Sequence, residues 1–220
     1  MPAAARIYII GIGYKPLDRR GRGIVIASDI ILTFSRLLEI FKGYAEFPTV
    51  KDKIRVVTDG DEIIALIRDN KTAVITILAS GDPLFHGIGR KIIGEFGKDM
   101  VEILPDVSCV QLAFAKIKES WDDAVLISLH GHGDSENKGK LEDIPLLLQR
   151  YKKVAVLTNK GNHPAEIARF LDTLRLPLKM YIVQRLGYAD ESIIEGCPGD
   201  IAQMKFLEPN MVIIIVEEKY

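Results

Sequence analysis

The chain has 220 residues, of which 48% are hydrophobic and 27% are charged, and this length allows one large domain or two of about a hundred residues each. Its formal net charge of -1 produces no overall field that would attract nucleic acid or an anionic membrane. No apolar run reaches the ~20 residues that span a bilayer, and Cys109 and Cys197 stand far apart. We therefore expect a soluble, cytoplasmic protein with free thiols.

Apolar runs alternate with amphipathic runs through the first half of the chain, which predicts strands alternating with helices and a largely parallel sheet. We expect strands at 7–12, 30–33, 54–57, 73–78 and 101–104. We expect helices at 24–28, 35–41, 59–68, 88–96 and 110–117. Ser108 is a candidate N-cap for the last of these helices.

The composition becomes polar after residues 116–121, and we place a domain boundary there, giving domains 1–117 and 118–220. In the second domain we expect strands at 124–129, 153–157, 180–184, 191–195 and 211–216, with helices at 141–150, 165–174 and 201–205. The strands at 180–184 and 191–195 are predicted to pair as a hairpin. A polar loop is expected at 133–140.

One stretch, Leu-Ala-Ser-Gly-Asp-Pro-Leu-Phe-His-Gly-Ile-Gly at 78–89, joins a predicted strand to a predicted helix. Its small residues let the backbone come close to a ligand, and Asp82-Pro83 marks a turn before the helix. In open α/β sheets, ligands bind at strand-end loops of this kind. Two interpretations stay open at this point, a binding loop and an ordinary Gly-Asp-Pro turn.

A basic run follows the first strand, with Lys15, Arg19, Arg20 and Arg22 all falling within 15–23. One interpretation is a solvated loop that leads into the helix at 24–28. The other is an anion-binding lip beside the first strand, because guanidinium groups bind carboxylates strongly.

Two histidines, His130 and His132, follow the strand at 124–129, with Asp134 close behind them. Metal ligands can have this spacing. However, neither a third His nor a Cys accompanies them, and a Gly-rich loop does not fix a tetrahedral site. We expect a ligand-facing loop or a simple turn here rather than a metal centre.

Taken together, the loops resemble those of the tetrapyrrole methyltransferases, the class III family that uses S-adenosylmethionine. The resemblance is carried by Gly-Ile-Gly at 11–13, Ser-Gly-Asp-Pro at 80–83 and Pro-Asp-Val-Ser at 105–108. It extends over nearly the whole chain, through 78–89, 107–115, 121–124, 128–131 and 185–187. The pattern is most similar to the branch that methylates C5 of precorrin-7 or cobalt-precorrin-7 in cobalamin synthesis.

The resemblance implies two α/β domains with mixed sheets, flanking helices and a cleft between the domains that holds S-adenosylmethionine, usually in a homodimer. By similarity, the residues that bind the donor are Tyr14, Gly81, Asp82, Phe85, Ser108, Cys109, Thr158, Leu186 and Asn210. Ser108 also fits a helix cap and Leu186 a core residue, and both roles can coexist with binding.

The implied reaction transfers a methyl group to an electron-rich meso carbon of the macrocycle. Such a displacement needs alignment more than a strong base, so we expect no catalytic dyad and assign no catalytic residue. The acceptor would carry several carboxylates, and we expect cationic side chains to bind them, namely Arg19, Arg20, Arg22, His130 and His132.

Some relatives carry a second module that methylates C15 and decarboxylates the acceptor. Because this chain ends directly after its last predicted strand, we expect methylation at C5 only, with a separate C15-methylating decarboxylase as pathway partner.

The chain departs from the family pattern in two places. The first loop continues as Tyr-Lys-Pro at 14–16, where the family usually has another glycine and an acid. Asp106 stands where the family usually has glycine, so we expect an unusual backbone conformation there, which Asp tolerates better than most residues.

Two other functions stay open. One is another branch of the same family, an enzyme that modifies diphthamide or ribosomal RNA, although the low net charge counts against RNA. The other is a non-catalytic nucleotide-binding α/β module, which a methyl-transfer assay would distinguish from an enzyme.

Overall fold

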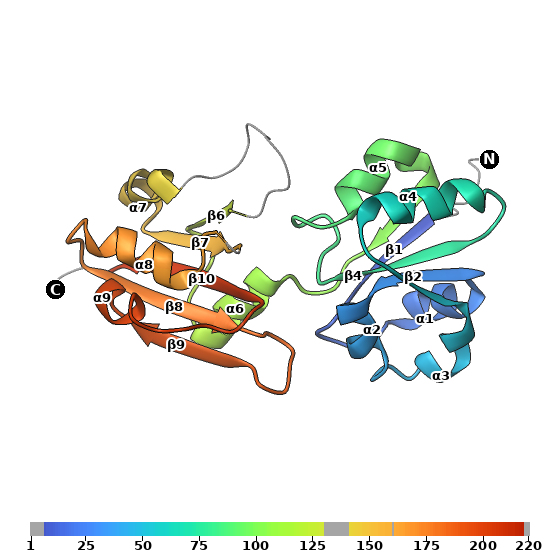
Figure 1. Ribbon diagram of the computed structural model, residues 1–220, viewed down its shortest axis with the longest axis horizontal. Coiled ribbons are helices and arrows are strands. Elements are labelled where there is room, and N and C mark those ends of the chain that lie inside the picture. The colour runs from blue at the N-terminus through green and yellow to red at the C-terminus, as the bar shows by residue number, and fades with distance from the viewer. Residues whose placement is uncertain (1–6, 130–140, 160, 218–220) are drawn as a thin grey trace. The chain divides into compact units, whose positions relative to one another are not determined.

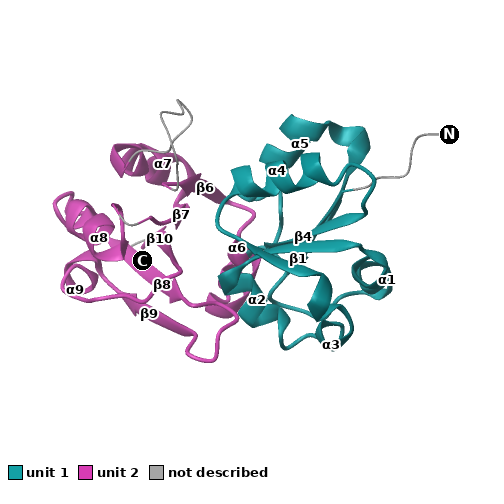
Figure 2. Ribbon diagram, turned by 45° about the vertical axis from the view of Figure 1, so that its right-hand side comes forward, with its two compact units in different colours: residues 1–108 teal, residues 109–220 magenta. Residues whose placement is uncertain are grey.

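The computed structural model describes residues 7–129, 141–159 and 161–217 (Figure 1). These residues form two compact units, the first ending at Ser108 and the second beginning at Cys109 (Figure 2). The boundary predicted after residue 117 lies at the other end of α6 (Cys109–Ile117), the helix that opens the second unit. Each unit has its own five-stranded sheet in the described residues, and the predicted α/β class is confirmed.

The sheet of the first unit is parallel throughout, with the order β3-β2-β4-β1-β5. Its strands are β1 (Ile7–Ile12), β2 (Ile30–Phe34), β3 (Ile54–Val57), β4 (Ile75–Ser80) and β5 (Val101–Leu104). Parallel pairing brings the carboxyl ends of these strands to one edge of the sheet. The strand predicted at 73–78 runs two residues later, because Ala79 and Ser80 still pair with Gly11 and Ile12 of β1.

Helices cover both faces of this sheet (Figure 1). They are α1 (Arg19–Ala27), α2 (Ser35–Phe41), α3 (Phe47–Val50), α4 (Gly60–Asp69) and α5 (Gly89–Phe96), with 3-10 turns at Lys51–Lys53 and Lys98–Met100. On one face, α4 and α5 pack Ile63, Ile67 and Ile92 onto the strands. On the other, α2 contributes Leu37 and Phe41. Burial on both faces explains why these strands are continuous apolar runs.

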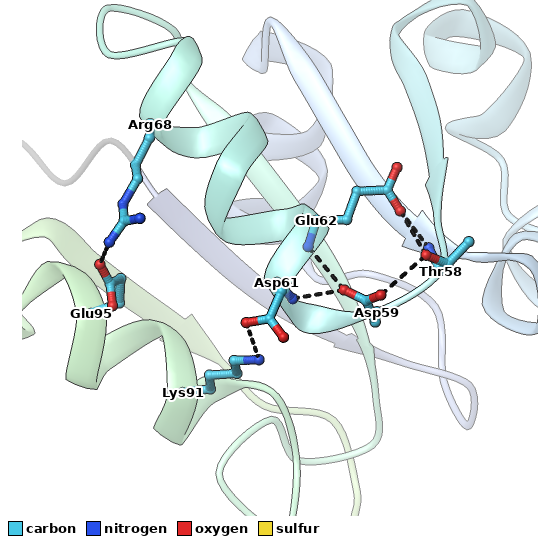
Figure 3. A network of polar contacts seen from close by, with 7 residues as sticks. All are labelled: Thr58, Asp59, Asp61, Glu62, Arg68, Lys91 and Glu95. Atoms are coloured by element: carbon cyan, nitrogen blue, oxygen red, sulfur yellow. Dashed lines mark hydrogen bonds and ion pairs between the residues drawn. The ribbon is translucent and has the colours of Figure 1, made fainter.

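Polar contacts on the exposed side of α4 and α5 join the two helices (Figure 3). Asp59 caps α4 by accepting the backbone N–H groups of Glu62 and Asp61, each at 2.9 Å, and these two hydrogen bonds lower the pKa of the Asp59 carboxyl. Lys91 lies 2.8 Å from the Asp61 carboxylate, and Arg68 pairs with Glu95. Because exposed ion pairs contribute little, the buried isoleucines fix the position of these helices.

The sheet of the second unit is mixed, with the order β6-β7-β10-β8-β9. Its strands are β6 (Ala124–Ser128), β7 (Lys153–Leu157), β8 (Leu178–Gln184), β9 (Ser192–Gly196) and β10 (Asn210–Val216). Only the β6–β7 pair is parallel among the described strands, and β8 and β9 form the predicted antiparallel hairpin.

The other helices of the second unit are α7 (Ile144–Tyr151), α8 (Pro164–Asp172) and α9 (Pro198–Ile201), preceded by a 3-10 turn at Leu141–Asp143. They pack apolar side chains such as Leu148, Ile167 and Ile201 onto the sheet. The helix predicted at 201–205 is wrong, because Pro198 occupies the first turn and starts α9 earlier.

His130, His132 and the predicted loop at 133–140 lie outside the described residues. Within the described ranges, no helix has the length and apolar character that a bilayer crossing requires.

Candidate functional site

Three loops of the first unit meet at the carboxyl ends of β1, β4 and β5. The backbone N–H of Gly81, just after β4, donates to the carbonyl of Ile12 at 3.0 Å. The carbonyl of Gly81 in turn accepts the N–H of Asp106, just after β5, at 3.1 Å. The loop after β4 is therefore hydrogen-bonded on both sides and continues the sheet beyond the strand ends.

Glycine is required where these backbones approach. A Cβ at Gly11 would lie 1.9 Å from the oxygen of Gly81 and 2.5 Å from the nitrogen of Asp106. Gly81 has a φ of +58°, and a Cβ there would lie 2.9 Å from the oxygen of Val107. Gly13, with a φ of +131°, differs because nothing lies within 4 Å of its Cβ position. The side of Gly13 on which a Cβ would lie is therefore free, as a ligand that approaches the main chain from that side requires.

Asp106 connects the first and third loops through its side chain, which is 2% exposed. One carboxylate oxygen accepts the N–H of Tyr14 at 2.9 Å, and the other accepts the N–H of Val107 at 2.7 Å. Lys15 lies 3.8 Å from the carboxylate. The prediction of an unusual backbone conformation at Asp106 is wrong, because this residue is not among the described non-glycine residues with positive φ. Its carboxylate, rather than its backbone, distinguishes this position.

The motif at 78–89 folds into a compact turn after β4. Oδ1 of Asp82 accepts the N–H of Leu84 at 2.8 Å, which confirms the predicted turn chemistry. Among the described residues, none donates to the other oxygen of this partly buried carboxylate. The ring of Phe85 is also partly buried and lies edge-on to His86, with 4.9 Å between ring centroids. The turn thus offers a carboxylate oxygen and an aromatic ring, and its binding role stays a prediction.

The loop after β5 ends at two predicted donor-binding residues. Ser108 is buried, with 8% of its surface exposed, and Cys109 is partly buried at the first position of α6. Burial raises the pKa of the Cys109 thiol, and this effect exceeds the opposing effect of the backbone N–H of Val110. The thiol is therefore protonated at neutral pH and acts as a small, weakly polar side chain.

The arginines of the basic run lie on α1 and not in a loop. The prediction of a loop at 15–23 is wrong from Arg19 onward, because Asp18 caps a helix that starts at Arg19. Oδ1 of Asp18 accepts the N–H of Gly21 at 2.7 Å. The sequence contained this cap, but Gly21 and Gly23 lower the helical propensity of the segment.

Two of the three arginines already pair with carboxylates. Nε of Arg22 lies 2.7 Å from the buried Glu46, and Arg20 pairs with Glu102 of β5. No ion-pair partner of Arg19 occurs in the described part of the chain. An open depression of about 690 Å³ lies here, lined by Asp18, Arg19, Arg20, Gly23 and Ile24.

The second unit brings three further predicted residues together at one edge of its sheet. Thr158 follows β7, Leu186 follows β8, and Asn210 begins β10, which lies between those two strands. The hydroxyl of Thr158 donates to the carbonyl of Asn210 at 2.7 Å. Thr158 and Leu186 are 6% and 9% exposed, so both lie just beneath the surface of this edge.

Arg185 holds the loop that carries Leu186, a role the sequence analysis missed. Its N–H donates to the carbonyl of Pro209 at 2.7 Å, and Nη1 donates to the carbonyl of Glu208 at 3.1 Å. Nε lies 2.6 Å from Asp190, and the guanidinium lies 4.4 Å from the centroid of the Tyr188 ring. Its φ of +51° is rare for a residue with a side chain.

Comparison with known proteins identifies the family. The tetrapyrrole (corrin/porphyrin) methylases match residues 6–202 of the chain. A probable cobalt-precorrin-7 C(5)-methyltransferase of Methanocaldococcus jannaschii is 32% identical over 213 residues, which cover 91% of this chain and 93% of that one. The cobalt-precorrin-7 C(5)-methyltransferase of Salmonella typhimurium is 34% identical over 174 residues, covering 79% and 82%.

The fold agrees with this assignment. A crystal structure of a cobalamin-biosynthesis precorrin-6Y methylase from Archaeoglobus fulgidus matches with a TM-score of 0.72, covering 98% of this chain and 100% of that chain. At 19% identity, this likeness shows the fold alone. The family that the sequence motifs predicted is confirmed: the chain is a methyltransferase and belongs to the tetrapyrrole (corrin/porphyrin) methylases.

Proposed function

We propose that the chain transfers a methyl group from S-adenosylmethionine to C5 of precorrin-7 or cobalt-precorrin-7 in cobalamin synthesis. The observation that carries this proposal is the similarity to the two C(5)-methyltransferases, because in one case it extends over 91% of this chain. Similarity over nearly the full length includes the strand-end loops of both units and not only the common scaffold.

The strand-end loops of the first unit fit such a donor. When bound, S-adenosylmethionine supplies a methyl group on a positively charged sulfonium, and it also carries an ammonium group. Asp82 has a carboxylate oxygen to which no described residue donates, and an ammonium group can donate to it. Beside Gly13 the backbone is open, and Phe85 offers an apolar wall. The full proposed donor set is Tyr14, Gly81, Asp82, Phe85, Ser108, Cys109, Thr158, Leu186 and Asn210.

The chemistry asks mainly for alignment. In the reaction, the meso carbon of the macrocycle would form a bond to the methyl carbon as the carbon–sulfur bond breaks, the sulfur would keep the bonding electrons as a neutral thioether, and the methylated macrocycle would then release one proton. Because that meso carbon is already electron-rich, no side chain has to act as a strong base to create the nucleophile. Holding both reactants in line supplies most of the acceleration, which is the role we assign to the donor-binding loops.

We propose that the acceptor's carboxylates bind to cations at the amino end of α1. Arg19 is the first candidate, because Arg20 and Arg22 already pair with Glu102 and Glu46. Replacing all three arginines with alanine is expected to weaken acceptor binding and leave donor binding unchanged. An equal loss of both would contradict this part of the proposal. His130 is a further proposed contact.

The proposal includes three properties of the whole protein. We propose that the chain acts as a homodimer, that it methylates C5 without releasing carbon dioxide, and that a separate enzyme methylates C15 and decarboxylates the acceptor. Both C(5)-methyltransferases it resembles are named for C5 alone, which supports this division. Sedimentation measures the oligomer, and trapping of labelled carbon dioxide tests for decarboxylation.

The decisive experiment supplies the protein with methyl-labelled S-adenosylmethionine and precorrin-7, with and without cobalt. Mass spectrometry then counts the methyl groups, and NMR locates the label. Label at C5 supports the proposal, whereas label at another carbon overturns it. Donor binding without transfer to either acceptor would favour a non-catalytic role. Asp82→Asn serves as the matched variant and is expected to bind the donor more weakly.

A further inference from the structure

The backbone that leaves β1 is held by side chains from distant parts of the chain. After Ile12 the chain leaves the sheet, so the following N–H and C=O groups need other partners. The carboxylate of Asp106 accepts the N–H of Tyr14 at 2.9 Å. Asp106 lies 92 positions further along the chain, so this contact exists only in the folded state.

A second side chain holds the same segment from the other side. The hydroxyl of Tyr44 accepts the N–H of Gly13 at 2.9 Å and donates to the carbonyl of Lys15 at 2.9 Å. Three consecutive residues therefore each have one main-chain group fixed by Asp106 or Tyr44. Gly13 is one of these held residues, and nothing lies within 4 Å of its Cβ position.

Asp106 is an unusual residue to bury, which indicates a specific role. Its side chain is 2% exposed, and removing a carboxylate from water is costly unless the charge is compensated. Here two backbone N–H groups and Lys15 at 3.8 Å supply the compensation. Each carboxylate oxygen thus accepts one backbone N–H, that of Tyr14 or that of Val107, and because the side chain is 2% exposed it acts on ligands only through these loops.

We propose that Asp106 is a positioning residue for the methyl donor: its buried carboxylate fixes the Tyr14 loop against the loop after β5 and so preforms the open backbone beside Gly13. This inference rests on the proposed function. A loop that is already ordered binds its ligand without a further entropic cost. If the loop is ordered for only a fraction of the time, the apparent dissociation constant rises by the inverse of that fraction.

The test compares Asp106→Ala, Asp106→Asn and the unaltered protein in calorimetric titrations with S-adenosylmethionine. Alanine leaves the N–H groups of Tyr14 and Val107 without their acceptor, and we expect binding to weaken about tenfold or more. Asparagine keeps one acceptor oxygen, so it should restore part of the affinity. In steady-state assays, the KM for the donor should rise while the KM for the acceptor stays unchanged.

Hydrogen exchange reports on the loop directly. The amide of Tyr14 should exchange more rapidly in Asp106→Ala, and saturating donor should restore its protection. Asp29→Ala is the matched control, because Asp29 also accepts a backbone N–H, that of Val74 at 2.7 Å, but lies beside the amino ends of β2 and β4. This control should leave donor affinity unchanged.

The outcomes separate the inference from the function on which it rests. If the unaltered protein does not bind S-adenosylmethionine, the proposed function and the donor role of Asp106 both fail. If it binds and Asp106→Ala binds equally well, the positioning role alone is overturned. If Asp106→Ala does not fold, Asp106→Asn decides the question, and its unchanged donor affinity with unchanged Tyr14 exchange would overturn the inference.

Discussion

The strand-end edges of the two units are built in different ways. In the first unit, the strand-end loops bond directly through their main chains, Gly81 with Ile12 at 3.0 Å and with Asp106 at 3.1 Å, and the side chains of Asp106 and Tyr44 reinforce them. This arrangement needs the absence of a side chain, because a Cβ at Gly11 would lie 1.9 Å from the oxygen of Gly81. The main chains can bond here because the parallel sheet brings successive strand ends to the same edge.

In the second unit, side chains bridge the edge. Gln184 accepts the N–H of Leu207 at 2.6 Å, Asn210 donates to the carbonyl of Leu207 at 2.9 Å, and Thr158 donates to Asn210. The mixed sheet places a strand start between two strand ends, and the gaps are filled by amide and hydroxyl groups. The first edge should therefore be the more sensitive to added atoms, whereas removing side-chain atoms is the main way to weaken the second.

The largest expected effect is that of Gly11→Ala. The new methyl group would overlap main-chain atoms of Gly81 and Asp106, which cannot move without breaking the edge. We expect a loss of at least about 3 kcal/mol in the free energy of unfolding, at the upper end of overpacking. Urea unfolding measures it. Gly94→Ala is the control: it lies in α5 with nothing within 4 Å, so it should stabilise by about 0.5–1 kcal/mol. Equal stability of the two variants would contradict the comparison.

The next effect comes from removing atoms in the second unit. Arg185→Ala removes the guanidinium contacts with Asp190, Glu208 and Tyr188, and we expect it to cost about 1–3 kcal/mol. Arg185→Gly loses the same contacts but relieves the φ of +51°, so its cost should be smaller by about 1 kcal/mol. Urea unfolding followed by circular dichroism measures both. A glycine variant less stable than the alanine variant would contradict the role of the strained backbone.

A smaller effect is expected for Tyr44→Phe, which removes one hydroxyl from the first edge. Losing its bonds to Gly13 and Lys15 should cost about 1 kcal/mol at neutral pH. Burial raises the pKa of the Tyr44 hydroxyl above its ordinary value. Above about pH 10 the unfolded chain loses this proton first, so the stabilisation fades as pH rises through the pKa of the folded state.

The measurement for Tyr44 is therefore a difference between two proteins. Urea unfolding gives the stability of the unaltered chain and of Tyr44→Phe, at neutral pH and again above about pH 10. Subtracting one stability from the other at each pH removes the contributions of the other titrating groups, which both proteins share. The gap in stability should narrow as pH rises. A constant gap would show that the hydroxyl is not held as described.

Local patterns were enough to predict most of the elements, because most strands are apolar runs and most helices are amphipathic. Thus β3, β5 and α2 have the predicted bounds. The start of α1 was missed because two glycines follow its cap at Asp18. The role of Asp106 could not be predicted, since it depends on β5 lying beside β1 in the sheet, and sheet order is not a local property. For the same reason, the contacts of Arg185 with Glu208 were invisible in the sequence.

The smallest expected effect is kinetic and concerns the residue that begins the second unit. A thiol reacts through its thiolate, and burial both raises the pKa of Cys109 and limits access to it. Cys197 is exposed, so a disulfide reagent at about pH 8 should modify it about tenfold faster than Cys109. Cys197→Ser and Cys109→Ser variants assign the two rates. If Cys109 contacts the donor as proposed, S-adenosylmethionine should slow its modification further and leave Cys197 unchanged. Protection of both thiols, or of neither, would show that Cys109 does not contact the donor and would remove it from the proposed donor set.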